Sequence, residues 1–490
     1  MKMLIYGIDG GDLEIMKTFN MPFVHKFLKE NVSVDLTEDL FNRGWVEILT
    51  GKEGKDTRGF YMSPVLDGSH RCATKFSMKD LENDPDIVPL WKLAEQKGVK
   101  YCIMNVPTTT PVPKTTNGIV IGSAGGGLNK IEGIPEMLVS DEKTRKFLED
   151  KNYVVDIRIP NRDISDTEEL FRQLKKMEDV RTDCFIEMCQ KEDVEFGLLA
   201  NRGTTIAQYL ARSEIESYAA LKEMSEFMLE GGQKSWVHNH LEEHYAALDN
   251  NIRCLYEELQ PDHFVITADH NTVPHKYRAS VTPFLLKHGY LRKKNIGKGS
   301  VIVKIKSMLK ILGLGGKIGK VTKKLSPGMR DALKEYDWSK SVAFGSKYIS
   351  GIYINDQRRF NGPVAEKDVD SLVGEICVTF NALSNSERRD MIATPYRSAN
   401  LDGKFSDALP DIMLSCSEGI FFYNSGNRIV WENPEYGPIP KDLQKVVHAA
   451  FTGDKGCNPV CLMDCQAAAY LSEHEPKNLT TVYNLAHQIL

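Results

Sequence analysis

The chain has 490 residues, of which 41% are hydrophobic and 26% are charged, and its formal net charge at pH 7 is −5. This composition is ordinary for a folded globular protein and excludes an intrinsically disordered chain. No stretch approaches the roughly 18 to 20 consecutive apolar residues of a membrane-spanning helix, so a transmembrane protein is not expected.

The first expected element is a strand at residues 3–9, where the sequence reads MLIYGID. Its apolar run of about five residues ends in Asp9 and is too short for a secretory signal peptide. The beginning of the chain therefore favours a cytoplasmic protein. An aspartate at the carboxyl end of a strand, followed by Gly10 and Gly11, suits a metal ligand or the cap of the next helix.

Residues 41–55, FNRGWVEILTGKEGK, contain an apolar helical face at 45–52 that ends in TGK. This ending resembles that of the active-site helix in enzymes that cleave phosphate esters. Such a helix should be preceded by a nucleophilic hydroxyl group. Phe41, Asn42 and Arg43 stand there instead, and none of them carries a hydroxyl group.

Apolar runs and helical patterns alternate along the rest of the chain. Strands are expected at 99–107, 117–124, 196–201, 263–270, 350–355 and 410–416, and helices at 89–98 and 242–260. This alternation predicts an α/β fold with a large, mainly parallel sheet flanked by helices on both faces. We expect one α/β domain over residues 1–490, with helical insertions at 128–190 and 286–340.

The strand expected at 263–270 ends in Asp269 and His270. Because ligands bind at the carboxyl ends of the strands in such sheets, we expect these two residues to lie near Asp9. A carboxylate beside an imidazole is a mixed oxygen and nitrogen donor set that suits zinc or manganese. The sequence therefore predicts a metal site at this edge of the sheet.

Two groups of residues offer weaker metal-binding patterns. His240 and His244 lie four residues apart, which allows them to share a helix face. A solvated, pH-sensitive face is the simpler interpretation, and replacement metal ligands are the alternative. Cys457, Cys461 and Cys465 match no common zinc or iron–sulfur spacing, so we expect buried structural thiols.

Residues 288–324 hold eleven Lys and Arg residues and no Asp or Glu. The apolar positions within this segment have helical spacing, which predicts an amphipathic basic helix. A surface lobe that covers the core is the simpler interpretation. Binding to an anionic membrane surface and attraction of a polyanionic substrate are the alternatives.

Several blocks of the sequence carry a family resemblance. They are MLIYGIDGGD, the 45–51 helix with its TGK ending, PLWKLAEQKGVKYCIMNVPTTTPVP, HYAALDNNI, VITADHNTVPHKYRASVTPFLLKHGYL, DWSKSVAFGSKYISGIYIND, LPDIML and LTTVYNLAHQIL. In this order they resemble the alkaline phosphatase superfamily, in particular its type I phosphodiesterase and nucleotide pyrophosphatase-like branch. The blocks span most of the chain, so the resemblance implies the α/β fold of that superfamily.

Members of this family bind two divalent metals that bracket a phosphate, and a Ser or Thr attacks the phosphorus. By this resemblance, Asp9, Asp269 and His270 match the ligands of the metal that holds the nucleophile. The position of the nucleophile is Phe41, and the nearest upstream hydroxyl alternative is Thr37. The resemblance thus implies one half of the site without its nucleophile.

The ligands of the second metal do not match. The family has an Asp and, four residues later, a His, and here Thr204 and Gln208 stand at these positions. The third ligand corresponds to Lys455, with His448 as the rival residue. A lysine ammonium could supply part of the missing positive charge, and Arg43 could bind an anion through two hydrogen bonds.

These features predict one divalent cation per chain, Zn²⁺, Mn²⁺ or Mg²⁺, and a small phosphorylated or nucleotide-like substrate. The expected activity is hydrolysis of a phosphodiester or nucleotide pyrophosphate, by water or by a displaced Thr37. Two alternatives stay open: a transferase, lyase or isomerase that acts on an anionic substrate, and a non-catalytic protein that keeps the scaffold. No sequence-specific nucleic-acid binding is expected, and the sequence leaves the oligomeric state open.

Overall fold

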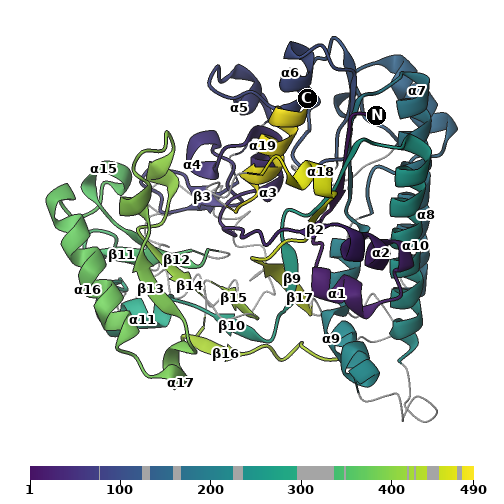
Figure 1. Cartoon of the computed structure of the whole chain (residues 1–490). Coiled ribbons are helices and arrows are strands. Elements are labelled where there is room, and N and C mark those ends of the chain that lie inside the picture. The colour runs from purple at the N-terminus through teal and green to yellow at the C-terminus, as the bar shows by residue number, and fades with distance from the viewer. Residues whose placement is uncertain are drawn as a thin grey trace.

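The structure is a computed structural model of the chain. It describes residues 1–74, 76, 78–123, 133–157, 167–223, 235–294, 336–346, 349–415, 419–423, 426–438, 452–471 and 477–490. These residues form a larger lobe around one sheet and a smaller lobe beside it (Figure 1). None of the helices described is both long enough and apolar enough to cross a membrane.

The sheet of the larger lobe has seven strands in the order β2-β18-β8-β1-β7-β5-β6. Their bounds are β1 (Met3–Ile8), β2 (Val32–Ser33), β5 (Tyr101–Met104), β6 (Gly118–Ile121), β7 (Phe196–Asn201), β8 (His263–Thr267) and β18 (Cys461–Met463). The five strands from β8 to β6 are parallel, and β18 is antiparallel to both of its neighbours. Because Ile8 lies beside Asn201 and Gly7 beside Thr267, the central strands end level with one another.

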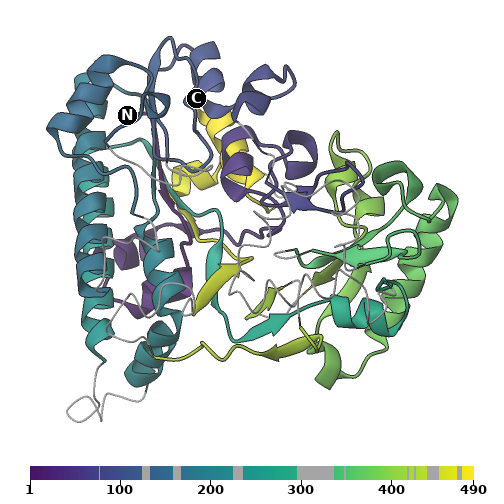
Figure 2. The same cartoon turned by 180° about the vertical axis from the view of Figure 1, so that it is seen from behind.

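Helices cover both faces of this sheet (Figures 1 and 2). One face carries α1 (Leu13–Thr18), α2 (Pro22–Glu30), α8 (Thr167–Lys191), α9 (Gly203–Glu223) and α10 (Trp236–Leu259), and the other carries α3 (Gly44–Thr50), α5 (Met78–Asn83), α6 (Leu90–Gln96) and α19 (Thr480–Ile489). Successive side chains of a strand point to opposite faces, so Leu4 and Tyr6 enter the first core while Met3 and Ile5 enter the second.

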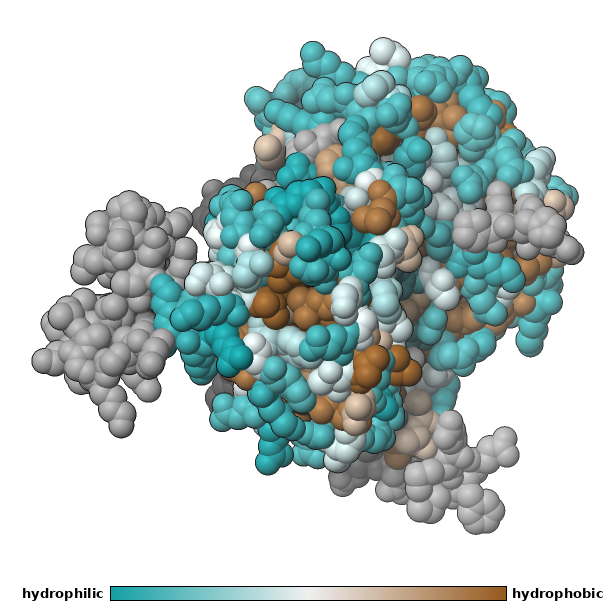
Figure 3. Space-filling view, turned by 90° about the vertical axis from the view of Figure 1, so that its left-hand side faces the viewer, coloured by the Kyte–Doolittle hydropathy of each residue, from teal (hydrophilic) through white to brown (hydrophobic). Residues whose placement is uncertain are grey.

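The smaller lobe has its own apolar core around an antiparallel sheet. Its elements include α11 (Thr282–Lys287), β11 (Ala343–Gly345), β12 (Gly351–Ile354), α15 (Gln357–Phe360), α16 (Val369–Asn381), α17 (Asn385–Arg388), β13 (Ile392–Pro395) and β14 (Ile412–Ser415). Figure 3 shows a face on which apolar groups lie between hydrophilic ones, and the exposed apolar residues of this lobe include Val378 on α16 and Ile392 in β13.

Short elements join the two lobes and complete the larger one. They are α4 (Gly54–Thr57), β3 (Ser63–Pro64), β4 (Cys72–Ala73), α7 (Glu142–Asp150), β9 (Asn271–Pro274), β10 (Tyr277–Ala279), β15 (Ile420–Phe422), β16 (Val430–Glu432), β17 (Gly453–Gly456) and α18 (Cys465–Ala468). Strand β17 pairs antiparallel with β9, which places Lys455 beside the segment that follows Asp269 and His270.

All the strands and helices expected from the apolar patterns are present, and the prediction of a large, mainly parallel sheet with helices on both faces is confirmed. Two of the strands, β12 and β14, belong to the separate sheet of the smaller lobe. Within the segment 128–190, helix α8 packs into the main core, and the interpretation of this segment as an insertion stays a prediction. The basic segment 288–324 lies mostly outside the described residues, so its amphipathic helix stays a prediction.

The prediction of three buried thiols is wrong for two of the three cysteines. Cys461 is buried in β18, whereas Cys457 and Cys465 are exposed. The reason is that the segment does not form one helix. It passes through a turn that contains Pro459, then through β18 and into α18, so the four-residue spacing does not place the three residues on one face.

Candidate metal centre

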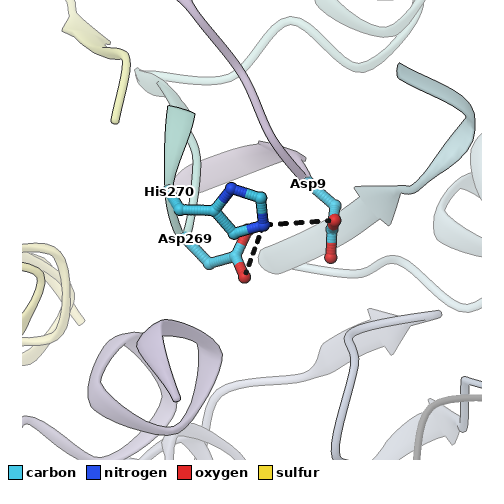
Figure 4. A group of neighbouring side chains, drawn as sticks. All are labelled: Asp9, Asp269 and His270. Atoms are coloured by element: carbon cyan, nitrogen blue, oxygen red, sulfur yellow. Dashed lines mark ion pairs between the residues drawn. The ribbon is translucent and has the colours of Figure 1, made fainter. Parts of the chain in front are cut away.

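Three side chains meet at the carboxyl edge of the central strands. Asp9 follows β1, and Asp269 and His270 follow β8, the neighbouring strand. One ligand atom from each residue lies within 4.8 Å of the others, and the described part of the chain contains no other such group. His270 Nε2 is 3.8 Å from Asp9 Oδ1 and 3.7 Å from Asp269 Oδ2, as Figure 4 shows.

Hydrogen bonds fix the orientation of these three ligand candidates. Asp9 accepts hydrogen bonds from the Trp45 indole N–H, at 3.0 Å, and from the Thr205 hydroxyl. His270 Nδ1 is 2.7 Å from the carbonyl oxygen of Asn271, which can only accept, so Nδ1 carries the proton. The lone pair of Nε2 therefore faces both carboxylates, as a metal ligand requires.

Close packing brings helix α3 against the centre. A Cβ atom on Gly44 would lie 2.4 Å from the Asp269 carbonyl oxygen, and a Cβ atom on Gly7 would lie 2.5 Å from the Trp45 ring. Real Cβ contacts are not this short, so only glycine allows α3 and β1 to approach in this way. The two glycines thus permit the hydrogen bond between Trp45 and Asp9.

The protonation states agree with a centre that is built for a cation. Burial, followed by the charge of Asp9, raises the pKa of Asp269 to about 8. Burial, followed by the charge of Lys455, lowers the pKa of His270 to about 3. Burial acts to raise the pKa of Asp9, but His270, Arg202 and Lys455 outweigh it and the pKa is lowered. Two carboxylates and one neutral imidazole, all buried, fit zinc or manganese.

The two positions that correspond to the second metal site carry buried side chains with structural partners. Gln208 donates to the Tyr245 hydroxyl at 2.8 Å and accepts from the Thr272 hydroxyl at 2.6 Å. The Thr204 hydroxyl lies 3.4 Å from His244 Nε2. These contacts use the side chains as hydrogen-bonding groups of the core, and neither side chain belongs to the metal-ligand group described above.

His240 and His244 lie on α10, and only His244 is fully buried. Burial lowers the pKa of His244 to about 4. His240 is more accessible and lies 3.8 Å from both Glu168 and Glu243. Among the described residues, the two histidines do not converge with a third ligand as Asp9, Asp269 and His270 do.

Lys455 reaches the centre from β17. Its ammonium nitrogen is 3.9 Å from Asp269 Oδ2 and donates a hydrogen bond to the Tyr61 hydroxyl, which itself lies 3.4 Å from the same carboxylate oxygen. Burial lowers the pKa of Lys455, although Asp269 and Asp9 oppose this effect. The side chain remains 25% exposed, so it borders the centre on an accessible side.

Arg43 lies on the same side of the centre. Its Nε donates to the Phe60 carbonyl oxygen at 2.9 Å, and its guanidinium group lies 5.1 Å from the centroid of the Tyr61 ring. Its charge contributes to the lowered pKa of Lys455, so the two cations are electrostatic neighbours. No carboxylate lies within 4 Å of Arg43 among the described residues, which leaves its charge available to an anion.

The other candidates from the sequence lie away from the three ligands. Phe41 packs on Phe60 with ring centroids 4.7 Å apart and belongs to the core of the smaller lobe. Asn42 is buried and pairs through its backbone with Phe60. Thr37 is exposed and donates to the Lys477 carbonyl oxygen at 3.3 Å. His448 lies outside the described residues.

Four contributors to the site were not identified in the sequence. Trp45 and Thr205 hold Asp9, Tyr61 links Lys455 to Asp269, and Arg202 lowers the pKa of Asp9 while it pairs with Asp156 at 2.6 Å. Arg202 directly follows β7 and Thr205 lies in the first turn of α9, so the strand-end rule that found Asp9 could also have found them. No local pattern marks Tyr61.

No model of a known protein family and no curated protein sequence matches this chain. Among solved structures, phosphonoacetate hydrolase from Sinorhizobium meliloti 1021 in complex with phosphonoacetate aligns with a TM-score of 0.53 and 9% identity, over 100% of this chain and 95% of the hydrolase. Its complex with phosphonoformate aligns over the same shares, with a TM-score of 0.51 and 10% identity. An inactive form of murine ectonucleotide pyrophosphatase/phosphodiesterase 5 in complex with AMP aligns with a TM-score of 0.47 and 12% identity, over 100% and 94%.

The likeness to phosphonoacetate hydrolase extends over the whole chain. The chain therefore has the alkaline-phosphatase-like α/β fold, and the family resemblance seen in the sequence blocks is confirmed at the level of the fold. At sequence identities near 10%, this likeness concerns the fold alone.

Proposed function

We propose that the protein is a metal-dependent hydrolase of phosphodiester or pyrophosphate bonds with one divalent metal at Asp9, Asp269 and His270. The observation that carries this proposal is the convergence of these three ligands beside two accessible cations, Lys455 and Arg43. The phosphonoacetate and phosphonoformate bound in the solved structures of phosphonoacetate hydrolase support a small anionic phosphorus-containing substrate.

Under this proposal, the residues around the centre have separate roles in binding the metal and the substrate. A divalent cation at the three ligands would supply Lewis-acid stabilisation of charge on a phosphoryl oxygen. Lys455 and Arg43 would bind the other phosphoryl oxygens, Lys455 as a point charge and Arg43 through a planar pair of donors. The Trp45 and Thr205 hydrogen bonds keep Asp9 in place while the substrate binds.

Phe41 determines how the phosphorus is attacked. Because Phe41, which matches the family's nucleophile position in the sequence, carries no hydroxyl group and packs on Phe60, and Thr37 donates to the Lys477 carbonyl oxygen, we infer that water is the nucleophile. The reaction then takes a single displacement: the bond from water oxygen to phosphorus forms as the bond to the leaving oxygen breaks. No covalent phosphoenzyme is expected.

The test offers the purified chain, loaded separately with Zn²⁺, Mn²⁺ or Mg²⁺, bis-p-nitrophenyl phosphate and several nucleotide sugars. Turnover is expected with at least one metal and is lost in Asp9→Ala, which removes a ligand. Lys455→Ala is expected to raise KM at least tenfold, since a charged hydrogen bond to the substrate contributes about 1.5–3 kcal/mol. Turnover that does not exceed that of Asp9→Ala would contradict the proposal.

A transferase, lyase or isomerase that acts on an anionic substrate is the second candidate. The observation that favours it is the filling of the second metal site by Thr204 and Gln208, which removes half of the hydrolytic machinery of the family. Reaction in ¹⁸O-labelled water separates the two. Hydrolysis places one labelled oxygen on the phosphoryl product, whereas transfer, elimination or isomerisation places none.

A further inference from the structure

A third cation lies at the carboxyl edge of the sheet, on the side of Asp9 away from Asp269. Arg202 is the first residue after β7, and β7 borders β1 on the side opposite to β8. The Asp9 N–H donates to the Asn201 carbonyl oxygen at 2.8 Å, so the backbones of Asp9 and Arg202 lie side by side. Lys455, by contrast, approaches Asp269 at the end of β8. The strand order β8-β1-β7 therefore places Asp9 between these two cations.

The alternation of side chains along the strands directs Arg202 and Asp9 to the same face of the sheet. Gly7 and Ala200 are partners in β1 and β7. Both lie on the face covered by α3, because Gly7 packs against Trp45 and Ala200 belongs to the apolar core that contains Trp45. Residues two positions apart point to the same face of a strand. Continued to the first residue after each strand, this alternation places Asp9 and Arg202 on the α3 face together.

The helix that follows Arg202 borders the same side of the centre. Thr205, in the first turn of α9, donates a hydrogen bond to Asp9. The Tyr209 ring, about one turn further along, stacks on His270 with ring centroids 6.2 Å apart. Arg202 thus begins a segment whose side chains reach two of the three candidate metal ligands.

The guanidinium group of Arg202 is held at one end. Its Nη1 donates to Asp156 Oδ2 at 2.6 Å, and the Asp156 side chain is 3% exposed whereas that of Arg202 is 32% exposed. Within the described part of the chain, Nε and Nη2 of Arg202 make no hydrogen bond. These two nitrogens form the edge that binds a carboxylate or a phosphoryl group through two parallel hydrogen bonds. Arg145 uses the same edge on Glu142, with distances of 2.8 and 2.6 Å.

We propose that Arg202 is a third substrate-binding cation, whose Nε–Nη2 edge binds anionic oxygen of the substrate from the β7 side while Asp156 holds Nη1. This role rests on the proposed function, in which Lys455 and Arg43 bind phosphoryl oxygens from the other side of the centre. Because Asp156 already fixes the plane of the guanidinium group, Arg202 loses little conformational freedom when an anion binds.

Calorimetry of sulfate binding to the full chain, in EDTA and again with Zn²⁺, tests this role. Sulfate is a tetrahedral dianion that cannot be turned over as a phosphate ester, so its affinity reports the cations alone. The double substitution Arg202→Met and Asp156→Asn removes the cation together with its buried partner and leaves neither charge unpaired. It should weaken sulfate binding about tenfold under both conditions, which is the effect of losing a charged hydrogen bond.

The matched control is the double substitution Arg253→Met and Glu257→Gln, which removes an ion pair on α10. This pair lies near the end of the helix, from which the chain enters β8 at the edge of the sheet opposite to the centre. Sulfate should bind this control as tightly as it binds the wild type. Wild-type affinity in the Arg202 double variant would overturn the proposal, as would a wild type that binds no sulfate, and Arg202 would then serve only as the partner of Asp156.

Arg202→Lys tests the role of the planar edge and decides the question if the double variant does not fold. A lysine keeps the positive charge beside Asp156 but offers a single ammonium group in place of the edge. Its affinity for sulfate should lie below that of the wild type. An affinity equal to that of the wild type would overturn the assignment of the edge.

Turnover of bis-p-nitrophenyl phosphate separates this role from the function on which it rests. In the Arg202 double variant the KM should rise about tenfold, whereas a purely structural role would lower the Tm and leave the KM unchanged. Wild-type turnover with no effect of Arg202 on KM or on sulfate affinity would retain the proposed function and overturn the role of Arg202. Sulfate binding that depends on Arg202, in a wild type without turnover, would retain the anion-binding role and contradict the proposed function.

Discussion

At the scale of single residues, the candidate metal centre places buried carboxylates side by side. Their negative charge is tolerable in the interior only when a cation or a proton offsets it. The raised pKa of Asp269, about 8, means that this carboxyl keeps a proton at neutral pH. The lowered pKa of His270, about 3, means that the imidazole is neutral and needs no deprotonation before it binds a metal. Under the proposed function, uptake of a metal at this centre would therefore release one proton from Asp269.

We therefore predict that the affinity for Zn²⁺ rises about tenfold for each pH unit between pH 6 and pH 8 and then levels off. The affinity rises with pH because the metal competes with a proton for Asp269. Below pH 8 the metal must displace this proton, and above pH 8 it need not. Calorimetry in buffers with different ionisation enthalpies should count one proton released at pH 6.5. An affinity that does not change between pH 6 and pH 8 would contradict the assignment of Asp269 as a ligand.

Phe41 is the second residue whose environment determines its role. We predict that Phe41→Thr, which restores a hydroxyl group at the position of the family nucleophile, gives no gain in turnover. The ring packs against Phe60 in the core of the smaller lobe, so its loss costs about 3–5 kcal/mol in free energy of unfolding. Urea denaturation measures this cost, and Phe41→Leu is the control that keeps most of the apolar volume. Faster hydrolysis by Phe41→Thr would show that the side chain faces the substrate.

At the scale of the elements, helix α3 connects the centre to the rest of the fold. Its Gly44 lies against the backbone of Asp269, and its Trp45 donates a hydrogen bond to Asp9. A displacement of this short helix would therefore affect both Asp9 and the backbone of Asp269.

Gly44→Ala is predicted to weaken Zn²⁺ binding at least tenfold and to cost about 1–3 kcal/mol in stability, because the added methyl group would lie 2.4 Å from the Asp269 carbonyl oxygen. Isothermal calorimetry and urea denaturation measure the two effects. Gly374→Ala is the matched control: it lies within α16, and an added Cβ meets nothing within 4 Å. This control should be neutral or slightly stabilising. Equal metal affinity in Gly44→Ala and the wild type would disprove the role of this contact.

The sequence predicted the site residues whose positions follow directly from where the strands end. Asp9, Asp269 and His270 were found because parallel strands end at a common edge, and this rule needs only the position of each strand. The contacts of Tyr61 with Lys455 and Asp269 could not be found in this way. They arise where loops from distant parts of the chain fold against each other, and no periodicity or spacing records such contacts. The assignment of β12 and β14 to a second sheet also depends on long-range pairing.

At the scale of the whole molecule, two apolar cores meet near the candidate centre. One is the core of the larger lobe that contains Trp45, and the other is the core of the smaller lobe. Phe41 and Phe60 belong to the core of the smaller lobe, although Phe41 lies only two residues before Arg43. The smaller lobe also contains a fully buried ion-pair network, in which Arg359 contacts Asp356 at 2.5 Å and Asp411 at 2.6 Å. Removing Asp411 would take one of two buried carboxylates from Arg359 and leave Asp356 as its remaining partner.

Asp411→Asn is therefore predicted to destabilise the protein by about 1.5–3 kcal/mol, because the Arg359 guanidinium loses one of its two buried charged hydrogen bonds. Asp407→Asn is the control, since Asp407 is 39% exposed and pairs with Arg358 and Arg397 at the surface of the same lobe. That variant should lose less than about 1 kcal/mol. Urea denaturation followed by tryptophan fluorescence compares the two. Similar losses of stability in the two variants would mean that the buried network contributes no more to stability than a surface ion pair does.

Helix α19 packs against α3: the Tyr483 ring lies against Gly51, and the Leu479 side chain lies against Gly44. The centre thus combines an aspartate from the ninth position of the chain, a lysine from position 455 and a helix supported by residues beyond 478. During synthesis on the ribosome, the first ligand emerges long before the support of α3 has been translated. A nascent chain therefore presents Asp9 without its partners, and the complete centre can form only after helix α19 has emerged from the ribosome.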